Sequence, residues 1–356
     1  MRPAYVSTIE GMPIGREYAS DYFVNKFPEH DLKYYIDYFG VENRFAALKH
    51  EDEPQTTTSI LHFMRQTMLD SAQHLCERMQ KRSAQCYSNI DTIIFCSGSS
   101  LFFLPNAAAE LQRRINISSI KTMEIKGGCA SVLSGINVAS SFVQTGKSDT
   151  VLVIGCDVFA CYFYNHFLRS HAAGKRPDKN SIVNMLLFSD GVSGLLVSKD
   201  KATDDVCYQI DYCDYKSLSD QLPSGFEVSF EYSDPHLPIV SKNHHKIIRK
   251  NMPYFLKQVF GYFDSKIDFG LIKSLIIPQA NQSLINNIFE SSQLTYHKDC
   301  EIEYFGDRIG NAPSASLLLA LSMSLKRKKK APESIAILAI ETASWTGGIL
   351  TLARAT

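Results

Sequence analysis

Cys129 is the residue of this chain best suited to act as a covalent nucleophile. It follows two glycines in the segment Ile125–Gly135, which reads Ile-Lys-Gly-Gly-Cys-Ala-Ser-Val-Leu-Ser-Gly. The glycines permit a tight turn with unusual φ values. The small residues that follow predict a closely packed helix, which ends near Gly146 as its C′ glycine. A thiol at a helix start is expected to have a lowered pKa, and its thiolate is the nucleophile; the alternative is a buried small residue.

A second candidate, Asn311, lies 182 residues after Cys129. Nearly the same offset separates the two copies of three patterns that appear twice in the same order. These patterns are an apolar strand with a polar end, a glycine turn that opens a small-residue helix, and another apolar strand. The paired segments are 90–97 with 272–279, 126–131 with 308–313, and 150–155 with 334–339. Three matches in order, at a nearly constant offset, indicate a duplicated α/β unit.

The duplication gives Asn311 a possible chemical role. If the two halves meet around a pseudo-two-fold axis, the helix starts at Cys129 and Asn311 face each other across one site. The thiol would then take an acyl group while the amide donates a hydrogen bond to a developing oxyanion or enolate. Asn311 also fits an N-cap position, and the two roles are compatible.

The elements that position these residues are predicted from the hydrophobic pattern. The strands are short continuous apolar runs, typical of central strands covered by helices on both faces. Segments of helical length lie between them, and this alternation predicts βαβ units. These helical segments are 58–79, 130–144 and 283–291. We expect two similar halves, residues 1–200 and 201–356, packed as one body, with an irregular loop over about 220–243.

The composition is that of a globular protein with a large core. The chain has 356 residues, 45% of them hydrophobic, and a formal net charge of zero, which gives no support for a nucleic-acid partner. No apolar run reaches about 18 residues, so no membrane span is expected. We see no signal peptide. The nine cysteines form no CxxC pair, which argues against a disulfide framework and indicates a cytoplasmic protein.

Four segments resemble motifs of the ketoacyl synthase III enzymes, in the family's order along nearly the whole chain. The segment 127–131 resembles their nucleophile elbow, and 188–194, Phe-Ser-Asp-Gly-Val-Ser-Gly, resembles their FGDGAGA turn. The segment 310–316 resembles the GNTSAAS motif with its catalytic asparagine. The segment 342–347 resembles the C-terminal glycine-rich turn followed by TWG.

This resemblance implies an α/β fold of the thiolase type, a duplicated five-layer αβαβα arrangement with pseudo-two-fold symmetry. It implies an acyltransferase with Cys129 and Asn311 as catalytic residues, which takes acyl groups from acyl-CoA or acyl carrier protein. The oxyanion hole would use backbone N–H groups of Cys129 and of Ala343 or Ser344. We expect a homodimer, or a heterodimer with a homologue, with no bound cofactor and no metal site.

One departure from the family concerns its histidine. The family pattern Pro-His-Gln-Ala-Asn corresponds here to Pro278-Gln279-Ala280-Asn281, so the histidine position holds Pro278 or, with a deletion, Gln279. The family's histidine stabilises the enolate released by malonyl decarboxylation, and losing such a group typically costs about 10²–10³ in rate. Other histidines considered as replacements are His166, His171, His236, His244, His245 and His297.

Two aromatic segments lie where the family has its acyl tunnel or dimer interface. They contain Phe102 and Phe103 in the first, and Phe163 and His166 in the second. One interpretation is ordinary core, because large apolar side chains are usually buried. The other is a shaped pocket for an unusual or short acyl group.

Three hypotheses follow for the function. The first is acyl transfer or non-standard condensation through a Cys129 thioester, in polyketide-like or fatty-acid-like specialised metabolism. The second is an auxiliary subunit of a heterodimer with an active ketosynthase; the retained Cys129 and Asn311 argue against it. The third is an enzyme of the hydroxymethylglutaryl-CoA synthase type, with Glu341 or Glu124 as the base.

Overall fold

One strand order occurs twice in the fold. The computed structural model describes residues 2–203, 205–230, 239–279, 285–286, 288 and 299–355. The first half has the order β5-β4-β6-β7-β1, and the second half has the order β12-β11-β13-β14-β8. The strands are β1 (Tyr5–Pro13), β4 (Thr92–Ser97), β5 (Lys121–Lys126), β6 (Thr150–Asp157), β7 (Gly191–Ser198), β8 (Tyr208–Ser217), β11 (Ser274–Ile276), β12 (Glu301–Glu303), β13 (Ser334–Glu341) and β14 (Thr346–Arg354).

The strand directions repeat as well. In the first half β4 is parallel to β5 and β6, while β7 is antiparallel to β6 and β1. In the second half β11 is parallel to β12 and β13, while β14 is antiparallel to β13 and β8. A short antiparallel contact between β1 and β8 joins the two halves. The predicted duplicated fold class is therefore confirmed; the exact division at residue 200 stays a prediction.

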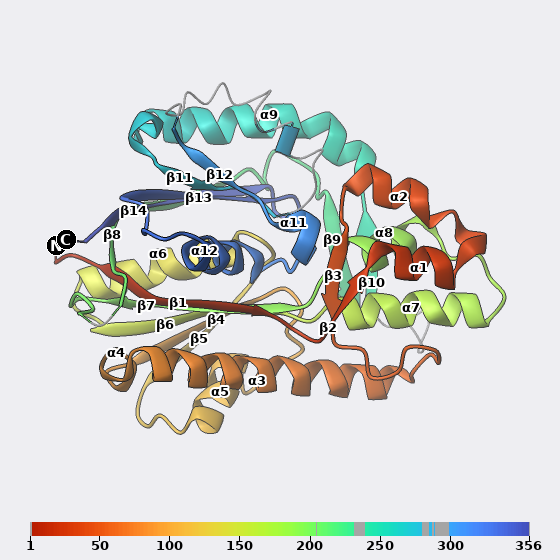
Figure 1. The fold of residues 1–356 in the computed structure, drawn as a ribbon, viewed down its shortest axis with the longest axis horizontal. Coiled ribbons are helices and arrows are strands. Elements are labelled where there is room, and N and C mark those ends of the chain that lie inside the picture. Colours follow the sequence, from red (N-terminus) through yellow and green to blue (C-terminus); the bar gives the residue numbers. More distant parts are fainter. Residues whose placement is uncertain are drawn as a thin grey trace.

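The helices complete five layers, αβαβα (Figure 1). Helices α6 (Ser131–Gln144) and α12 (Ser316–Arg327) lie between the two half-sheets. Helices α3 (Thr57–Arg82), α4 (Ala84–Ser88) and α5 (Ala107–Ile115) cover the outer face of the first half-sheet. Helix α9 (His245–Asp264) covers the outer face of the second. No helix in the described part of the chain is long and apolar enough to cross a membrane.

The local sequence explains where these elements begin and end. Every residue of β6 and β7 is buried, as continuous apolar runs predict. Helix α3 begins after Thr56, whose side chain accepts a hydrogen bond from Ser59 N. Helix α6 ends before Gly146, which has φ +77° and is the C′ glycine predicted from the sequence. The predicted helix at 283–291 lies largely outside the described residues.

Smaller elements form the right-hand end of the molecule in Figure 1, here called the cap region. They are α1 (Ser20–Lys26), η1 (Pro28–His30), α2 (Leu32–Phe39), α7 (Ala160–Ala172), α8 (Lys179–Leu187) and the strand pairs β2 (Arg16–Ala19) with β3 (Asn43–Ala46) and β9 (Phe226–Phe230) with β10 (Ile239–Asn243). The prediction of an irregular loop over 220–243 was partly wrong. Among the described residues, β9 and β10 form a separate two-stranded sheet. Their sequences, Phe-Glu-Val-Ser-Phe and Ile-Val-Ser-Lys-Asn, lack the continuous apolar run that marks the central strands.

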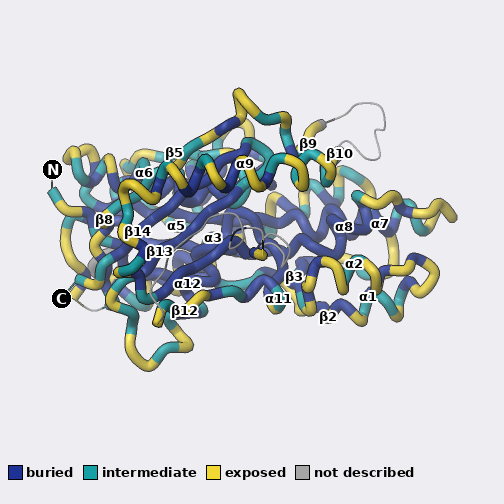
Figure 2. The backbone as a smooth tube through the Cα atoms, turned by 90° about the horizontal axis from the view of Figure 1, so that it is seen from above, coloured by how far each residue is buried: buried dark blue, intermediate teal, exposed yellow. Residues whose placement is uncertain are grey.

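Figure 2 shows that burial is concentrated along the strands and the two middle helices, whereas exposed residues lie on the outer side of α9 and around the cap region. One core cluster fills the space between the half-sheets around α6 and α12. The two middle helices are therefore enclosed on both faces, and their N-terminal ends are the parts that bear the candidate site.

Gly155 on β6 allows the second half to approach the first. A Cβ atom at this position would lie 2.0 Å from the backbone oxygen of Ser314. Ser314 belongs to the loop that leads from Asn311 into α12. The absence of a side chain at Gly155 therefore determines how close Asn311 comes to the first half.

We predict that Gly155→Ala destabilises the protein by about 1–3 kcal/mol, because the new methyl group must displace backbone. Gly261→Ala is the matched control, since Gly261 is on α9 and a Cβ there meets nothing within 4 Å. The control should stabilise the helix by about 0.5–1 kcal/mol. Urea denaturation measures both changes; an unchanged free energy of unfolding for Gly155→Ala would contradict the close-approach argument.

Candidate active site

Cys129 and Asn311 face each other in the structure. Cys129 lies in the turn between β5 and α6, and its Sγ is 3.9 Å from Asn311 Oδ1. Gly310 precedes Asn311 with φ +64°, a conformation that favours glycine. The backbone of Asn311 is fixed at both ends, because its N–H donates to Leu187 O and its carbonyl accepts from Ser189 N. The two candidates predicted from the repeat offset thus lie within contact of one another.

Glu341, the last residue of β13, is the carboxylate of this site. Its Oε2 accepts hydrogen bonds from the backbone N–H groups of Gly128 at 2.9 Å and Ala130 at 3.2 Å. Its Oε1 accepts from Ser344 Oγ at 2.9 Å. One carboxylate from the second half therefore binds the residues on both sides of Cys129. Sequence analysis named Glu341 only as a candidate base and did not predict these contacts.

The elbow glycines Gly127 and Gly128 lie beside the Glu341 carboxylate. Neither Gly127 nor Gly128 has a positive φ, so the predicted unusual φ values were wrong. A Cβ atom on Gly128 would instead lie 3.4 Å from the Glu341 carboxylate. This is an ordinary van der Waals distance, so the position of Glu341 does not itself require glycine at 128; the tighter contact is at Gly127, where a Cβ atom would lie 3.1 Å from Ser131 Cβ.

Asp157 joins the two halves beneath the site. Its buried carboxylate accepts hydrogen bonds from Gly98 N at 2.9 Å, Ser99 N at 2.8 Å and Ser314 N at 2.6 Å. Ser314 Oγ in turn donates to Gly127 O at 3.2 Å. Sequence analysis did not single out Asp157 or Ser314. The only signal was that Asp157 is an acidic residue at the end of an otherwise apolar strand.

The motif 188–194 positions the cap region. Asp190 is buried and accepts hydrogen bonds from Ala47 N at 2.9 Å and Ala160 N at 2.7 Å. Burial raises the pKa of Asp190 to about 7. Because Ala160 is the first residue of α7, this carboxylate fixes the start of that helix.

The thiol of Cys129 has a raised pKa, which contradicts the lowered value predicted from the helix start. Burial raises the pKa of Cys129 to about 12, and the Glu341 and Asp157 carboxylates act in the same direction. The backbone N–H of Cys129 and the side chain of Asn311 lower this pKa by smaller amounts. Desolvation and two nearby negative charges thus outweigh the helix N-terminus.

The residues at the family's histidine position have structural roles. Pro278 and Gln279 are both buried. The Gln279 amide donates to Ile277 O at 2.6 Å and Glu303 O at 3.1 Å, and its Oε1 accepts from Phe305 N at 2.6 Å. Gln279 therefore joins backbone segments next to β11 and β12, and its amide is fully engaged.

The predicted oxyanion residues Ala343 and Ser344 lie in the four-residue turn between β13 and β14, directly after Glu341. This turn is firmly held. Ser344 O accepts hydrogen bonds from Ser217 Oγ and Ser219 Oγ, and buried Trp345, with φ +45°, donates to Pro223 O. Glu341 links this turn to the elbow, because its carboxylate accepts from Ser344 Oγ and from the N–H groups of Gly128 and Ala130.

The four predicted pocket residues do not share one environment. Phe102 and Phe163 belong to one buried cluster, in which Phe163 stacks on Phe159 at 5.4 Å between ring centroids. Phe103, by contrast, is 80% exposed, and Lys126 Nζ lies over its ring. His166 is half-buried on α7. The ordinary-core interpretation describes Phe102 and Phe163 in this structure.

The other histidines have different surroundings. His244 is 3.7 Å from Glu227, and His245 begins α9. His171, near the end of α7, contacts Glu29 and His30. His236 and His297 lie outside the described residues. Glu124, the second candidate base, accepts a hydrogen bond from Ala107 N at the start of α5.

Comparison with known proteins shows similarity to one family of condensing enzymes. A sequence profile of the family 3-oxoacyl-[acyl-carrier-protein (ACP)] synthase III matches residues 123–212, which include the elbow. The protein named beta-ketoacyl-[acyl-carrier-protein] synthase III 2 from Bacillus anthracis is 21% identical over 266 residues, 73% of this chain and 74% of its own length. A synthase III from Porphyra umbilicalis is 24% identical over 281 residues, 74% of this chain and 77% of its own.

Solved structures share the fold over the full length. AbyA1, a tetronic acid condensing enzyme, has a TM-score of 0.75 at 15% identity, covering 98% of this chain and 99% of its own. The 3-oxoacyl-[acyl-carrier-protein] synthase III from Aquifex aeolicus has a TM-score of 0.73 at 16% identity, covering 99% and 100%. The profile, the relatives and the shared fold together show that this chain is similar to the ketoacyl synthase III enzymes and has a thiolase-like fold.

Proposed function

We propose that this enzyme transfers acyl groups through a thioester on Cys129, taking them from acyl-CoA or acyl carrier protein. The proposal rests on the 3.9 Å contact between Cys129 Sγ and Asn311 Oδ1. In this contact a residue of the first half meets a residue of the second half. A thiol and an amide suit thioester chemistry, because the thiol forms the covalent bond and the amide can stabilise developing charge.

The first step exchanges one thioester for another. Cys129 Sγ attacks the carbonyl carbon of the donor thioester, and the new S–C bond forms as the donor's C–S bond breaks. The thiol of CoA or carrier protein leaves with the proton that Cys129 gave up. Backbone N–H groups of Cys129 and of the turn at Ala343 and Ser344 are proposed to stabilise the oxyanion of this step.

The second step is proposed to differ from malonyl decarboxylation. The family's imidazole position holds Pro278 or Gln279, and the Gln279 amide is used by three backbone groups. We infer that the acceptor arrives already nucleophilic, as an amine, an alcohol or an activated carbanion. Asn311 then orients the acceptor, since rotation of its amide presents either a donor or an acceptor to the site.

Glu341 is proposed to be a positioning residue that also controls the thiol. Its carboxylate binds the N–H groups of Gly128 and Ala130, and its charge raises the pKa of Cys129. The thiol is therefore protonated at neutral pH in this structure. Such a thiol resists alkylation and oxidation until a donor enters the site. Cytoplasmic location and dimer formation stay predictions.

Covalent loading is the direct test of the proposed function. The purified chain is mixed with a panel of acyl-CoAs and acyl carrier proteins, and its intact mass is measured. We expect a gain of one acyl group in the wild type and in Cys300→Ala, which removes a partly exposed thiol outside the site. The gain should be absent in Cys129→Ala.

Two outcomes would contradict the proposal. A mass gain that persists in Cys129→Ala would place the acyl group elsewhere. No gain with any donor, in a folded protein, would favour the auxiliary subunit of a heterodimer, and co-purification with a ketosynthase homologue would then be the next experiment.

The reactivity of the thiol should depend on the charge of Glu341. Below the thiol pKa the thiolate fraction, and hence the alkylation rate, falls tenfold per pH unit. Glu341→Gln removes the negative charge but keeps an oxygen acceptor for Gly128 and Ala130. We expect the pKa of Cys129 to fall by about one unit or more. The rate at which iodoacetamide alkylates Cys129 at pH 8 should then rise by about tenfold or more.

The control for this measurement is Glu124→Gln, because Glu124 also accepts a backbone N–H but from Ala107, away from Cys129. Its alkylation rate should match the wild type. Peptide mass mapping assigns the label to Cys129. An unchanged or slower rate in Glu341→Gln would show that this carboxylate does not control the thiol.

A further inference from the structure

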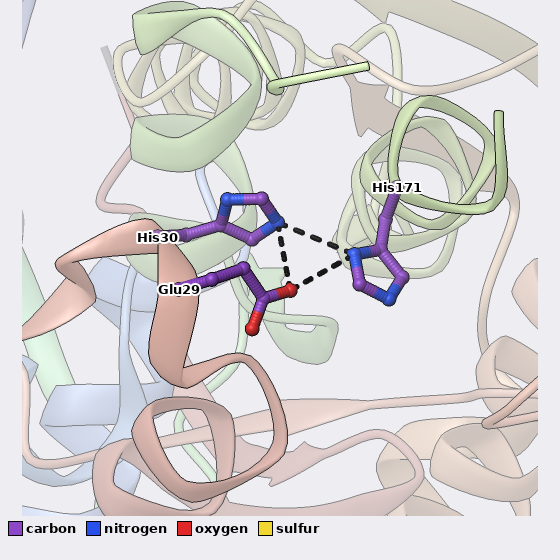
Figure 3. A group of neighbouring side chains, drawn as sticks. All are labelled: Glu29, His30 and His171. Atoms are coloured by element: carbon purple, nitrogen blue, oxygen red, sulfur yellow. Dashed lines mark hydrogen bonds and ion pairs between the residues drawn. The ribbon is translucent and has the colours of Figure 1, made fainter. Parts of the chain in front are cut away.

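Glu29, His30 and His171 form a compact group in the cap region, distinct from the site at Cys129. Glu29 Oε1 is 3.3 Å from His30 Nε2 and 3.2 Å from His171 Nδ1, and the two nitrogens are 3.3 Å apart. The three atoms therefore make a nearly equilateral triangle (Figure 3). We propose that this triangle is a binding site for a divalent transition-metal cation of the Zn²⁺ class, independent of the proposed acyl transfer.

The size of the triangle matches tetrahedral coordination. With bonds of about 2.0–2.1 Å from Zn²⁺ to imidazole nitrogen and carboxylate oxygen, neighbouring ligand atoms in a tetrahedron are about 3.3–3.4 Å apart. In an octahedron with bonds of about 2.1 Å they are about 3.0 Å apart. The observed separations of 3.2–3.3 Å favour the tetrahedral arrangement.

The surroundings hold the ligands on one side and leave the other side open. His30 is only 6% exposed and packs edge-on against Phe167 at 5.4 Å between ring centroids. His171 packs edge-on against Phe27 at 5.0 Å. The side chains of Glu29 and His171 are 49% and 40% exposed. A cation can therefore enter from solvent, and water can complete the fourth position.

The donor set selects the class of ion. Two imidazole nitrogens and one carboxylate oxygen suit Zn²⁺ and similar transition metals, whereas Ca²⁺ and Mg²⁺ prefer sites made of oxygen alone. The Glu29 carboxylate supplies one negative charge at the site. Arg176 acts on His30 as a nearby positive charge and so opposes the binding of a cation.

The site would connect two parts of the cap region that are far apart in sequence. Glu29 and His30 lie on η1, and His171 lies 141 residues later, near the end of α7. The start of α7 is held by Asp190, so a bound cation would fix its other end. We expected no metal site from the sequence, and ligands 141 residues apart form no spacing that could be recognised there.

Cobalt titration of the full chain tests the proposal. The protein is stripped with a chelator, dialysed and titrated with Co²⁺ and then with Zn²⁺ in competition. We expect the protein to bind one equivalent of Co²⁺ and to show visible d–d bands with the intensity of tetrahedral coordination, without a thiolate charge-transfer band. Zn²⁺ should displace the bound Co²⁺. His171→Ala should weaken Zn²⁺ binding by about 100-fold or more, since even indirect partners of a ligand contribute about 10–100-fold.

Two variants serve as controls. His74→Ala removes an exposed histidine that pairs with Glu77 at 3.7 Å without a third ligand, and Arg176→Ala removes the opposing charge. Both should retain Zn²⁺ binding. Glu29→Gln, a conservative change at an exposed position, should lose it while keeping the wild-type circular dichroism spectrum. Zn²⁺ should raise the melting temperature of the wild type but not that of Glu29→Gln.

Three results would overturn the proposal. The first is that Co²⁺ gives no tetrahedral spectrum. The second is that His171→Ala and Glu29→Gln bind Zn²⁺ with the affinity of the wild type. The third is a thiolate charge-transfer band, which would place the ion on a cysteine instead. In the first case the three side chains form a hydrogen-bonded group and no more.

Discussion

The buried carboxylate of Asp157 accepts hydrogen bonds from backbone N–H groups in one loop of each half, the loop after β4 and the loop that leads from Asn311 into α12. Gly98 and Ser99 belong to the first half of the fold, and Ser314 belongs to the second. Gly155 makes this possible because a side chain there would collide with Ser314. The positions of Cys129 and Asn311 depend on this junction. Ser314 lies three residues after Asn311, and its Oγ donates to the carbonyl of Gly127, which lies two residues before Cys129.

The same junction determines the chemistry of the thiol. Cys129 is only partly exposed between the two half-sheets, and the carboxylates of Glu341 and Asp157 add negative charge beside it. Burial stabilises the neutral thiol more strongly than the helix start stabilises the thiolate. In the proposed reaction, the thiol would therefore give up its proton as it attacks the donor thioester, without an imidazole at the position that Pro278 or Gln279 holds. That requirement suits acyl transfer better than enolate formation.

Much of this architecture could be predicted from the sequence, for an identifiable reason. The offset of 182 residues between Cys129 and Asn311 reflects a duplication, and a duplicated fold places equivalent positions around one axis. The contacts of Glu341 could not be predicted, because they depend on how the hairpin of β13 and β14 meets the elbow. The sign of the thiol pKa shift was missed because it depends on burial. The Glu29, His30 and His171 group was missed because tertiary packing alone brings it together.

The most direct test of the central claim is isotope exchange between free labelled CoA, or carrier-protein thiol, and the corresponding acyl thioester, measured without an acceptor. A ping-pong enzyme catalyses this exchange through its acylated thiol, because loading is reversible. We expect saturable exchange in the wild-type protein and none in Cys129→Ala. Exchange that survives in Cys129→Ala, or its absence with every donor in the folded wild-type protein, would contradict a Cys129 acyl-enzyme.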